Sequence, residues 1–242
     1  MPSRRDFLTL MTTLWLARAI ESADAAPAPL RDSLQARLRR LADLSRALAQ
    51  ARLRPLEWQR EVEALALGID LRELCQAADF DRVAAHLEPA KRGVNVESVR
   101  LAGLADQPFA AKIFVMGRGR AIIPHGHKNM VSHLLVLKGE LRGRHFERVR
   151  DEPGHLVLRP TIDRIFRAGD GSSISEERDN VHWFVAKSER AYTLDAIVDN
   201  LHPEMGYRFH IDNVDPAHAE PGEGGTLRAR ILELDEALRL YG

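Results

Sequence analysis

The sequence predicts a mainly β protein whose strands follow a helical amino-terminal segment. The spacing of apolar residues changes from about 3.6 to two near Val94, which marks the passage from helices to strands. Turn-forming residues then recur at short intervals, at Gly117, Gly139, Pro153-Gly154 and Asp170-Gly171. Many short strands separated by such turns indicate an antiparallel sandwich or barrel.

The composition excludes some partners. The 242 residues carry 35 basic and 35 acidic side chains, and the pI is near 7.2. This balance provides no electrostatic basis for binding nucleic acid or an anionic membrane surface. The single Cys75 excludes an intrachain disulfide. The oligomeric state is not encoded in any pattern that we can identify.

Residues 1–25 have the layout of an export signal. Paired arginines in Ser3–Leu8 precede a short apolar run, Phe7–Leu16, and Ala23-Asp24-Ala25 is a small-residue cleavage site. This order resembles a bacterial twin-arginine signal peptide and implies a periplasmic or secreted protein that begins near residue 26. The apolar run is too short for a stable membrane span. The alternative is a soluble amphipathic helix, because Arg18 and Glu21 interrupt its end.

Residues 26–92 form the predicted helical segment. Leucines three and four positions apart over Leu30–Leu53 define an amphipathic helix that ends before Pro55. The pattern repeats over Glu57–Leu67, and Asp70 is placed to cap a helix over Leu71–Ala78. This segment covers the barrel mouth, forms a dimer face or adds core, and the sequence does not choose among these roles.

Residues 93–215 form the predicted β-barrel, and residues 216–242 a tail with a helix. Apolar residues alternate in parts of Phe109–Met116 and of Val181–Val198, as in half-buried strands. After Pro216 the chain is rich in glycine and proline up to Gly225. Leu227–Leu240 then has the spacing of a short amphipathic helix.

The stretch Gly119–Gly139 carries the most informative motif, centred on His125-Gly126-His127. Residues i and i+2 of a strand face the same side, so both imidazoles point one way. Two co-facing imidazoles are a common start to a transition-metal site. The alternative is a pair of solvated histidines on a strand.

The surroundings of this pair resemble the first motif of the cupin superfamily. A glycine stands six residues before His125, and a leucine-rich strand leads from the pair to the turn at Gly139. The resemblance implies a cupin-type double-stranded β-helix (jelly-roll) barrel with a metal site. The sequence departs from the motif where the family usually has a glutamate ligand, because Val131 and Ser132 occupy those positions.

The same resemblance implies a third metal ligand on a later strand, and His182 is the candidate. The segment Arg178–His182, followed by Leu194-Asp195, resembles the second motif of thiol dioxygenases that act on cysteamine and on amino-terminal cysteines. Asp195 matches an aspartate of that group, and we expect it to orient a ligand histidine or a water, or else to be a strand-end surface residue. The remaining histidines have structural or surface interpretations: His86, His133, His145, His155, His202, His210 and His218.

The resemblance implies an exported, mononuclear non-haem Fe(II) dioxygenase that oxidises a small thiol with O₂ to a sulfinate. Three neutral imidazoles leave the ion its full charge and open positions, which suit a thiolate and O₂ side by side. Two alternatives remain. The site holds Mn, Ni or Zn for another reaction, or the protein binds or senses a ligand without turnover. A substrate carboxylate would need an inward-facing arginine, and the sequence does not choose among Arg118, Arg120, Arg142, Arg144 and Arg164.

Overall fold

Residues 33–242 are described in the computed structural model, and the predicted export signal in residues 1–25 lies outside them. Residues Leu34–Gly242 form one unit. Its helices are α2 (Leu34–Ala49), α3 (Pro55–Ala66), α4 (Leu71–Ala77), α5 (Phe80–His86) and α6 (Leu234–Tyr241), with short 3-10 turns η1 (Pro203–Met205) and η2 (Glu223–Gly225). Between residues 33 and 242, no helix has the length and apolar character needed to cross a bilayer.

The β region begins near Val94, as the change of period predicts. Its strands are β1 (Asn95–Val99), β2 (Ala110–Gly117), β3 (Ala121–Lys128), β4 (Met130–Lys138), β5 (Glu140–Glu152), β6 (His155–Arg167), β7 (Gly171–Ile174), β8 (Val181–Ala186), β9 (Arg190–Asp199), β10 (His210–Pro221) and β11 (Leu227–Leu232). The predicted turn at Gly139 joins β4 to β5, and its φ of 86° is a left-handed conformation that glycine adopts without strain.

Two antiparallel sheets make up the barrel. One has the strand order β1-β2-β9-β4-β7, and the other closes on itself as β10-β11-β6-β5-β8-β3. A shared core lies between β2-β9-β4-β7 and β3-β8-β5-β6, because one buried cluster takes Met116, Val136 and Ala191 from the first layer and Ile122 and Phe184 from the second. This is the double-stranded β-helix (jelly-roll) fold that the motif predicts.

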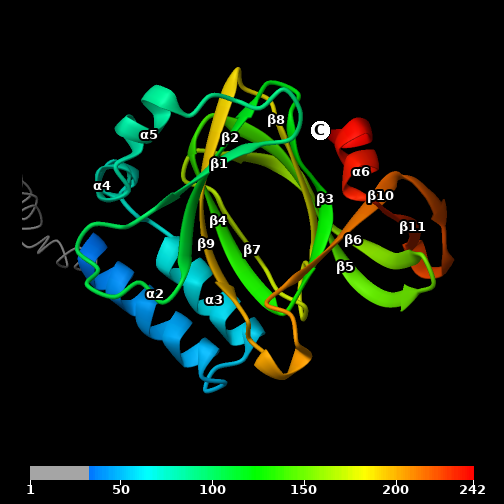
Figure 1. Cartoon of the computed structure of the whole chain (residues 1–242), viewed down its shortest axis with the longest axis horizontal. Coiled ribbons are helices and arrows are strands. Elements are labelled where there is room, and N and C mark those ends of the chain that lie inside the picture. Colours follow the sequence, from blue (N-terminus) through cyan, green and yellow to red (C-terminus); the bar gives the residue numbers. More distant parts are fainter. Residues whose placement is uncertain (1–32) are drawn as a thin grey trace, which may run out of the picture. The chain divides into compact units, whose positions relative to one another are not determined.

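The helical segment covers the outer face of the β1-β2-β9-β4-β7 sheet (Figure 1). Leu38 of α2 and Trp58 of α3 are buried in the same cluster as Leu135 and Leu194, which project from β4 and β9. The Trp58 indole donates a hydrogen bond to the Ser45 hydroxyl (3.3 Å), which ties α3 to α2. The segment therefore adds a second core behind the sheet.

Local signals explain where α3 and α4 begin. Pro55 begins α3, because a proline needs no N–H in the first turn of a helix. The Asp70 carboxylate caps α4 as predicted, accepting hydrogen bonds from the amides of Arg72 (2.8 Å) and Glu73 (3.1 Å).

The carboxyl-terminal region differs from the prediction of one helix over Leu227–Leu240. Its first half is strand β11, which pairs with β10 and β6, and α6 begins only at Leu234. Ala237 of α6 packs against Ile123 of β3 and Leu232 of β11. Residues after Pro216 thus complete the closed sheet and cover one side of β3.

We expect Gly143→Ala to destabilise the barrel. A Cβ at this position would lie 2.5 Å from the Phe166 ring and 2.6 Å from the Phe184 ring, and both rings are buried in the core. Overpacking of this kind costs about 1–3 kcal/mol, measurable as a shift of the urea midpoint. The double variant Gly143→Ala/Phe166→Leu should lose less than the sum of the single variants, whereas strict additivity would contradict this packing.

Candidate metal centre

The three predicted histidines converge inside the barrel. His125 of β3 lies directly opposite His182 of β8 in the antiparallel ladder, and His127 is two residues further along β3. Their ring centroids are 4.3 Å (His125–His182), 4.6 Å (His125–His127) and 5.0 Å (His127–His182) apart. One nitrogen from each ring lies within 4.8 Å of the other two.

A β-bulge in β3 gives this arrangement. Ile122 pairs with Phe184 and His125 pairs with His182, so the two pairs are three residues apart on β3 but two apart on β8. Pro124 lies within the extra length and has no N–H to donate to the neighbouring strand. The bulge keeps both Ile122 and His125 on the inner face of the sheet.

Burial keeps the three imidazoles neutral. His127 and His182 are each 6% exposed, and His125 is half-buried. Burial lowers the pKa of His125 and brings the pKa values of His127 and His182 well below their usual range, with neighbouring histidines adding a smaller effect for the latter two. Neutral rings offer a lone pair to a cation at physiological pH.

The ring nitrogens are poised for coordination. Nδ1–H of His125 donates to the carbonyl of Ile123 (2.7 Å), which leaves Nε2 as the donor atom for a metal. Nδ1 of His127 and Nδ1 of His182 are buried without a hydrogen-bond partner. In the described part of the chain, this trio is the one group of three or more His, Cys, Asp and Glu side chains able to hold a metal ion. The site can therefore hold a divalent ion through three neutral nitrogens.

Ser132 occupies the inner position where the cupin motif has its carboxylate. Ser132 shares a face of β4 with Leu134, which belongs to the barrel core, whereas Val131 belongs to the core under the helices. Ser132 is 6% exposed. At this position the barrel face of β4 therefore carries a small neutral hydroxyl and no anionic side chain.

Gly126 has a packing role between the two ligands. A Cβ there would lie 2.6 Å from the side-chain oxygen of Asn180. Asn180 in turn donates to the carbonyls of His127 (2.7 Å) and Ser175 (3.2 Å). The glycine thus admits the amide that ties β3 to the segment before β8.

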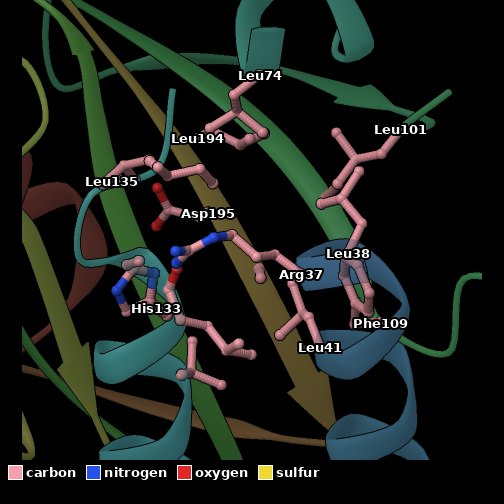
Figure 2. A pocket seen from close by; sticks show the side chains of 16 residues that line it. Arg37, Leu38, Leu41, Leu74, Leu101, Phe109, His133, Leu135, Leu194 and Asp195 are labelled. Atoms are coloured by element: carbon pink, nitrogen blue, oxygen red, sulfur yellow. The ribbon is translucent and has the colours of Figure 1, made fainter. Parts of the chain in front are cut away.

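Asp195 is a buried residue of β9 that also lines the cavity between the sheet and α2 (Figure 2). It pairs across the ladder with Leu134, and its carboxylate accepts a hydrogen bond from the Thr193 hydroxyl (2.9 Å). Burial raises the pKa of Asp195 to about 7. Because Nδ1 of His125 bonds to a carbonyl and Nδ1 of both other ligands has no partner, Asp195 orients none of the three rings through that nitrogen.

His133 points away from the trio, into the core behind the sheet. Figure 2 shows it near Arg37 of α2, in a small cavity whose walls are mainly apolar. Its Nε2 is buried without a partner, and burial lowers its pKa to about 4. Arg37 is held by the carbonyl of Leu67 (3.0 Å). Its location agrees with the structural interpretation of this histidine.

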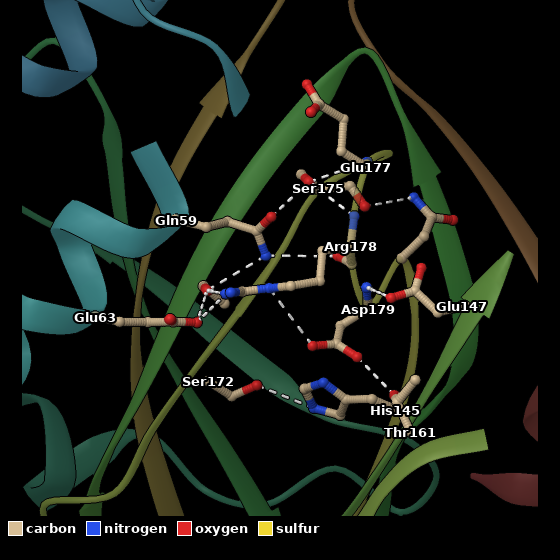
Figure 3. Close-up of polar contacts among 12 residues, drawn as sticks. Gln59, Glu63, His145, Glu147, Thr161, Ser172, Ser175, Glu177, Arg178 and Asp179 are labelled. Atoms are coloured by element: carbon tan, nitrogen blue, oxygen red, sulfur yellow. Dashed lines mark hydrogen bonds and ion pairs between the residues drawn. The ribbon is translucent and has the colours of Figure 1, made fainter. Parts of the chain in front are cut away.

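His145 is a fourth histidine near the site that the sequence did not single out. It pairs with His182 across β5 and β8, and the two ring centroids are 6.3 Å apart. Its Nε2 lies 2.9 Å from the Ser172 hydroxyl (Figure 3). The sequence around His145 contains no motif, so its position beside His182 becomes evident only from the pairing of β5 with β8.

A polar cluster joins the helical segment to the loop before β8. Glu63 of α3 pairs with Arg178, whose guanidinium also lies 3.7 Å from Asp179 (Figure 3). Asp179 accepts a hydrogen bond from Thr161 of β6 (2.6 Å). The loop that precedes His182 is thereby fixed to α3 and to β6.

A cleft of about 670 Å³ reaches the half-buried His125. It lies among residues of β2, β3, β10, β11 and α6, including Phe114, Ile122, Ile211 and Asn213. None of the five arginines considered from the sequence lines it. Of the three histidines His125 is the one that lines this cleft, so a small molecule in the cleft would meet the trio at that ring.

The solved structures that resemble this chain do so over parts of it and at low sequence identity. No family model and no curated protein matches the sequence. An uncharacterized conserved protein with a double-stranded beta-helix domain from Klebsiella pneumoniae is 16% identical over 48% of this chain and 80% of its own, with a TM-score of 0.35. KdgF from Halomonas sp. is 17% identical over 43% of this chain and 77% of its own (TM-score 0.33). Procruciferin, an 11S globulin from Brassica napus, is 14% identical over 57% of this chain (TM-score 0.37), and this chain spans 30% of its length.

We expect His182→Ala to abolish stoichiometric metal binding. The wild-type protein should hold about one divalent ion per chain after loading with Zn²⁺, or with Fe²⁺ without oxygen, because three neutral donors converge. His133→Ala is the matched control, since this buried histidine lies on the other side of the sheet. Elemental analysis of the folded proteins is the measurement. Full metal content in His182→Ala would contradict the site.

We expect stability to fall as the pH drops from about 6.5 to 4. The folded chain keeps His133 neutral down to pH 4 or so, with its pKa lowered to about 4, whereas the unfolded chain takes up a proton near pH 6.5. The neutral His133 therefore contributes its full share to the free energy of unfolding above pH 6.5. This share falls as the pH drops from 6.5 to 4, by about 3 kcal/mol at most. Urea unfolding at pH 7 and pH 4 should show a smaller loss in His133→Phe. Equal losses would refute this assignment.

Proposed function

We propose that the protein is a mononuclear non-haem Fe(II) dioxygenase that oxidises a small thiol to a sulfinate. The reaction adds both atoms of O₂ to sulfur, so RSH and O₂ give RSO₂⁻ and H⁺ without a further reductant. The observation that carries the proposal is the three-histidine set with Ser132 at the inner position of the usual carboxylate. The motif resemblance around His125 and His182 supports the same reaction class.

The donor set favours an anionic substrate. An Fe(II) ion held there would lower the pKa of a thiol and bring the thiolate and O₂ together. Because the protein donors are neutral, the charge of the ion is not compensated by the protein, and a thiolate supplies the missing negative charge. Ser132 leaves room for that ligand, since its side chain is much smaller than a glutamate.

Other residues of the chain prepare the site. Phe184, Met116 and Leu134 form an apolar wall inside the barrel, which limits water around the reacting groups. Asp195 is proposed to act through a water molecule, because its carboxylate bonds to Thr193 and not to Nδ1 of any ligand. With its pKa near 7, it can hold or release a proton at neutral pH.

We also propose that the protein works in the periplasm or outside the cell. Support comes from the order of paired arginines, apolar run and small-residue site in residues 1–25. Export should stop in an Arg4→Lys/Arg5→Lys variant expressed with its full chain in a bacterium that has twin-arginine transport. Processed protein in the periplasm at the wild-type level would argue against this route.

We expect the iron-loaded protein to consume O₂ in the presence of a thiol. An oxygen electrode with cysteamine, cysteine and 3-mercaptopropionate is the measurement, with sulfinate identified by mass spectrometry. His182→Ala should lose uptake together with iron, whereas Asp195→Asn should keep its iron and lose about tenfold or more in kcat. His133→Ala is the control, because it replaces a buried histidine on the other side of the sheet and should keep both iron and O₂ uptake.

The outcomes separate the alternatives. Protein that binds iron but takes up no O₂ with any thiol would contradict the dioxygenase and favour a ligand-binding role. Activity restored by Mn²⁺, Ni²⁺ or Zn²⁺ and not by Fe²⁺ would favour another reaction, since the order of metal affinities does not itself select iron.

A further inference from the structure

The cleft beside His125 has a carboxyl-terminal wall made by β10, β11 and α6. These elements lie outside the two motifs around His125 and His182. A molecule in the cleft would contact this wall and His125 together.

Asn213 is the polar group of this wall nearest to the trio along the ladder. It lies directly opposite His125 in the antiparallel pair of β10 and β3, so the two side chains share one face. Both residues line the cleft. The next residue, Val214, points the other way, into the core with Val181 and Phe146.

No hydrogen bond joins the Asn213 carboxamide to another residue among 33–242, and its polar atoms stay open to the cleft, although the residue as a whole is only 9% exposed. An amide placed in this way can meet a ligand without first giving up a hydrogen bond within the protein. An amide offers one acceptor and two donors. It is thus suited to a neutral amide or hydroxyl on the substrate.

The rest of the wall near His125 is apolar. Phe114, Ile122, Ile211 and Leu232 line the cleft from β2, β3, β10 and β11. The charge of Asp212 is matched by Arg148, at 2.7 Å. Arg92 and Glu233 also line the cleft but are exposed to solvent, and their charges are opposite. The exposed His210 also lines the cleft, and its ring lies 2.9 Å from the Asp212 carboxylate. In the buried part of the cleft, therefore, no unpaired charged side chain is left to select a carboxylate or an ammonium group.

We propose that the substrate is a thiol with an apolar body and one neutral polar group, and that Asn213 positions that group by a hydrogen bond. This inference rests on the proposed thiol oxidation. A charged carboxylate or ammonium group would lose its hydration in the cleft without gaining an opposite charge.

The test compares N-acetylcysteamine, which carries a neutral amide, with the cation cysteamine and the anion 3-mercaptopropionate. Wild-type iron-loaded protein should show a kcat/KM at least about tenfold higher for N-acetylcysteamine. Asn213→Leu should lose about tenfold for that thiol, mainly through KM with kcat little changed, and Asn213→Gln should restore part of it. Gln50→Leu, which removes an exposed amide at the end of α2, is the matched control.

Binding measured without turnover provides a second readout. Anaerobic calorimetric titration of the same proteins with the three thiols should give the same order of Kd, and Asn213→Asp should shift the preference toward cysteamine. Thiol oxidation that is equally efficient in the wild type and in Asn213→Leu would overturn this inference and leave the proposed function standing. If the wild type neither binds nor oxidises any thiol, the proposed function itself fails.

Discussion

One extra residue in β3 decides which way the metal-binding side chains point. In a regular strand, His125 would share a face with Ile123, which packs beneath α6 with Leu232 and Ala237. The bulge at Pro124 reverses this alternation, so that Ile122 belongs to the barrel core and His125 also faces inward. The trio, its neutral charge and the cleft all depend on this local irregularity.

The electrostatics of the site follow from its burial. Three imidazoles are packed together without a carboxylate, and burial keeps them unprotonated. A divalent ion there would gain three donors but no compensating negative charge, in a place where water is scarce. The site should therefore be completed by an anion from solution. Ser132 stands where the motif has a glutamate, so the protein supplies no negative charge at that position. Asn213 is proposed to select the substrate by a neutral hydrogen bond.

Short-range patterns in the sequence predicted a β sandwich or barrel and the pair of His125 and His127. The change of period near Val94 located the start of the strands, and two histidines two positions apart had to share a face. His182 was found only by resemblance, since nothing local distinguishes it from other strand histidines. The helix predicted over Leu227–Leu240 was wrong in its first half. The spacing of Leu227 and Ile231 fits a helix, but with Ala229 between them the same apolar residues alternate as in a strand, and the chain forms β11 there.

Other features were beyond single-sequence reasoning because they depend on pairing between distant strands. His145 lies beside His182 only through the register of β5 and β8, and Asn213 faces His125 only through that of β10 and β3. The bulge leaves no mark in the pattern of residues other than a proline. Asp195 was located as a candidate, but its bond to Thr193 redirects its proposed action from a ligand ring to a water.

The most direct measurement is an anomalous difference map from a crystal of the metal-loaded protein, with data collected on both sides of the absorption edge of the metal. We predict a single peak inside the barrel, at about 2.0–2.2 Å from one nitrogen each of His125, His127 and His182. No carboxylate oxygen of the protein should be equally near. A peak coordinated by a carboxylate, or rings turned to opposite faces of β3, would contradict the account.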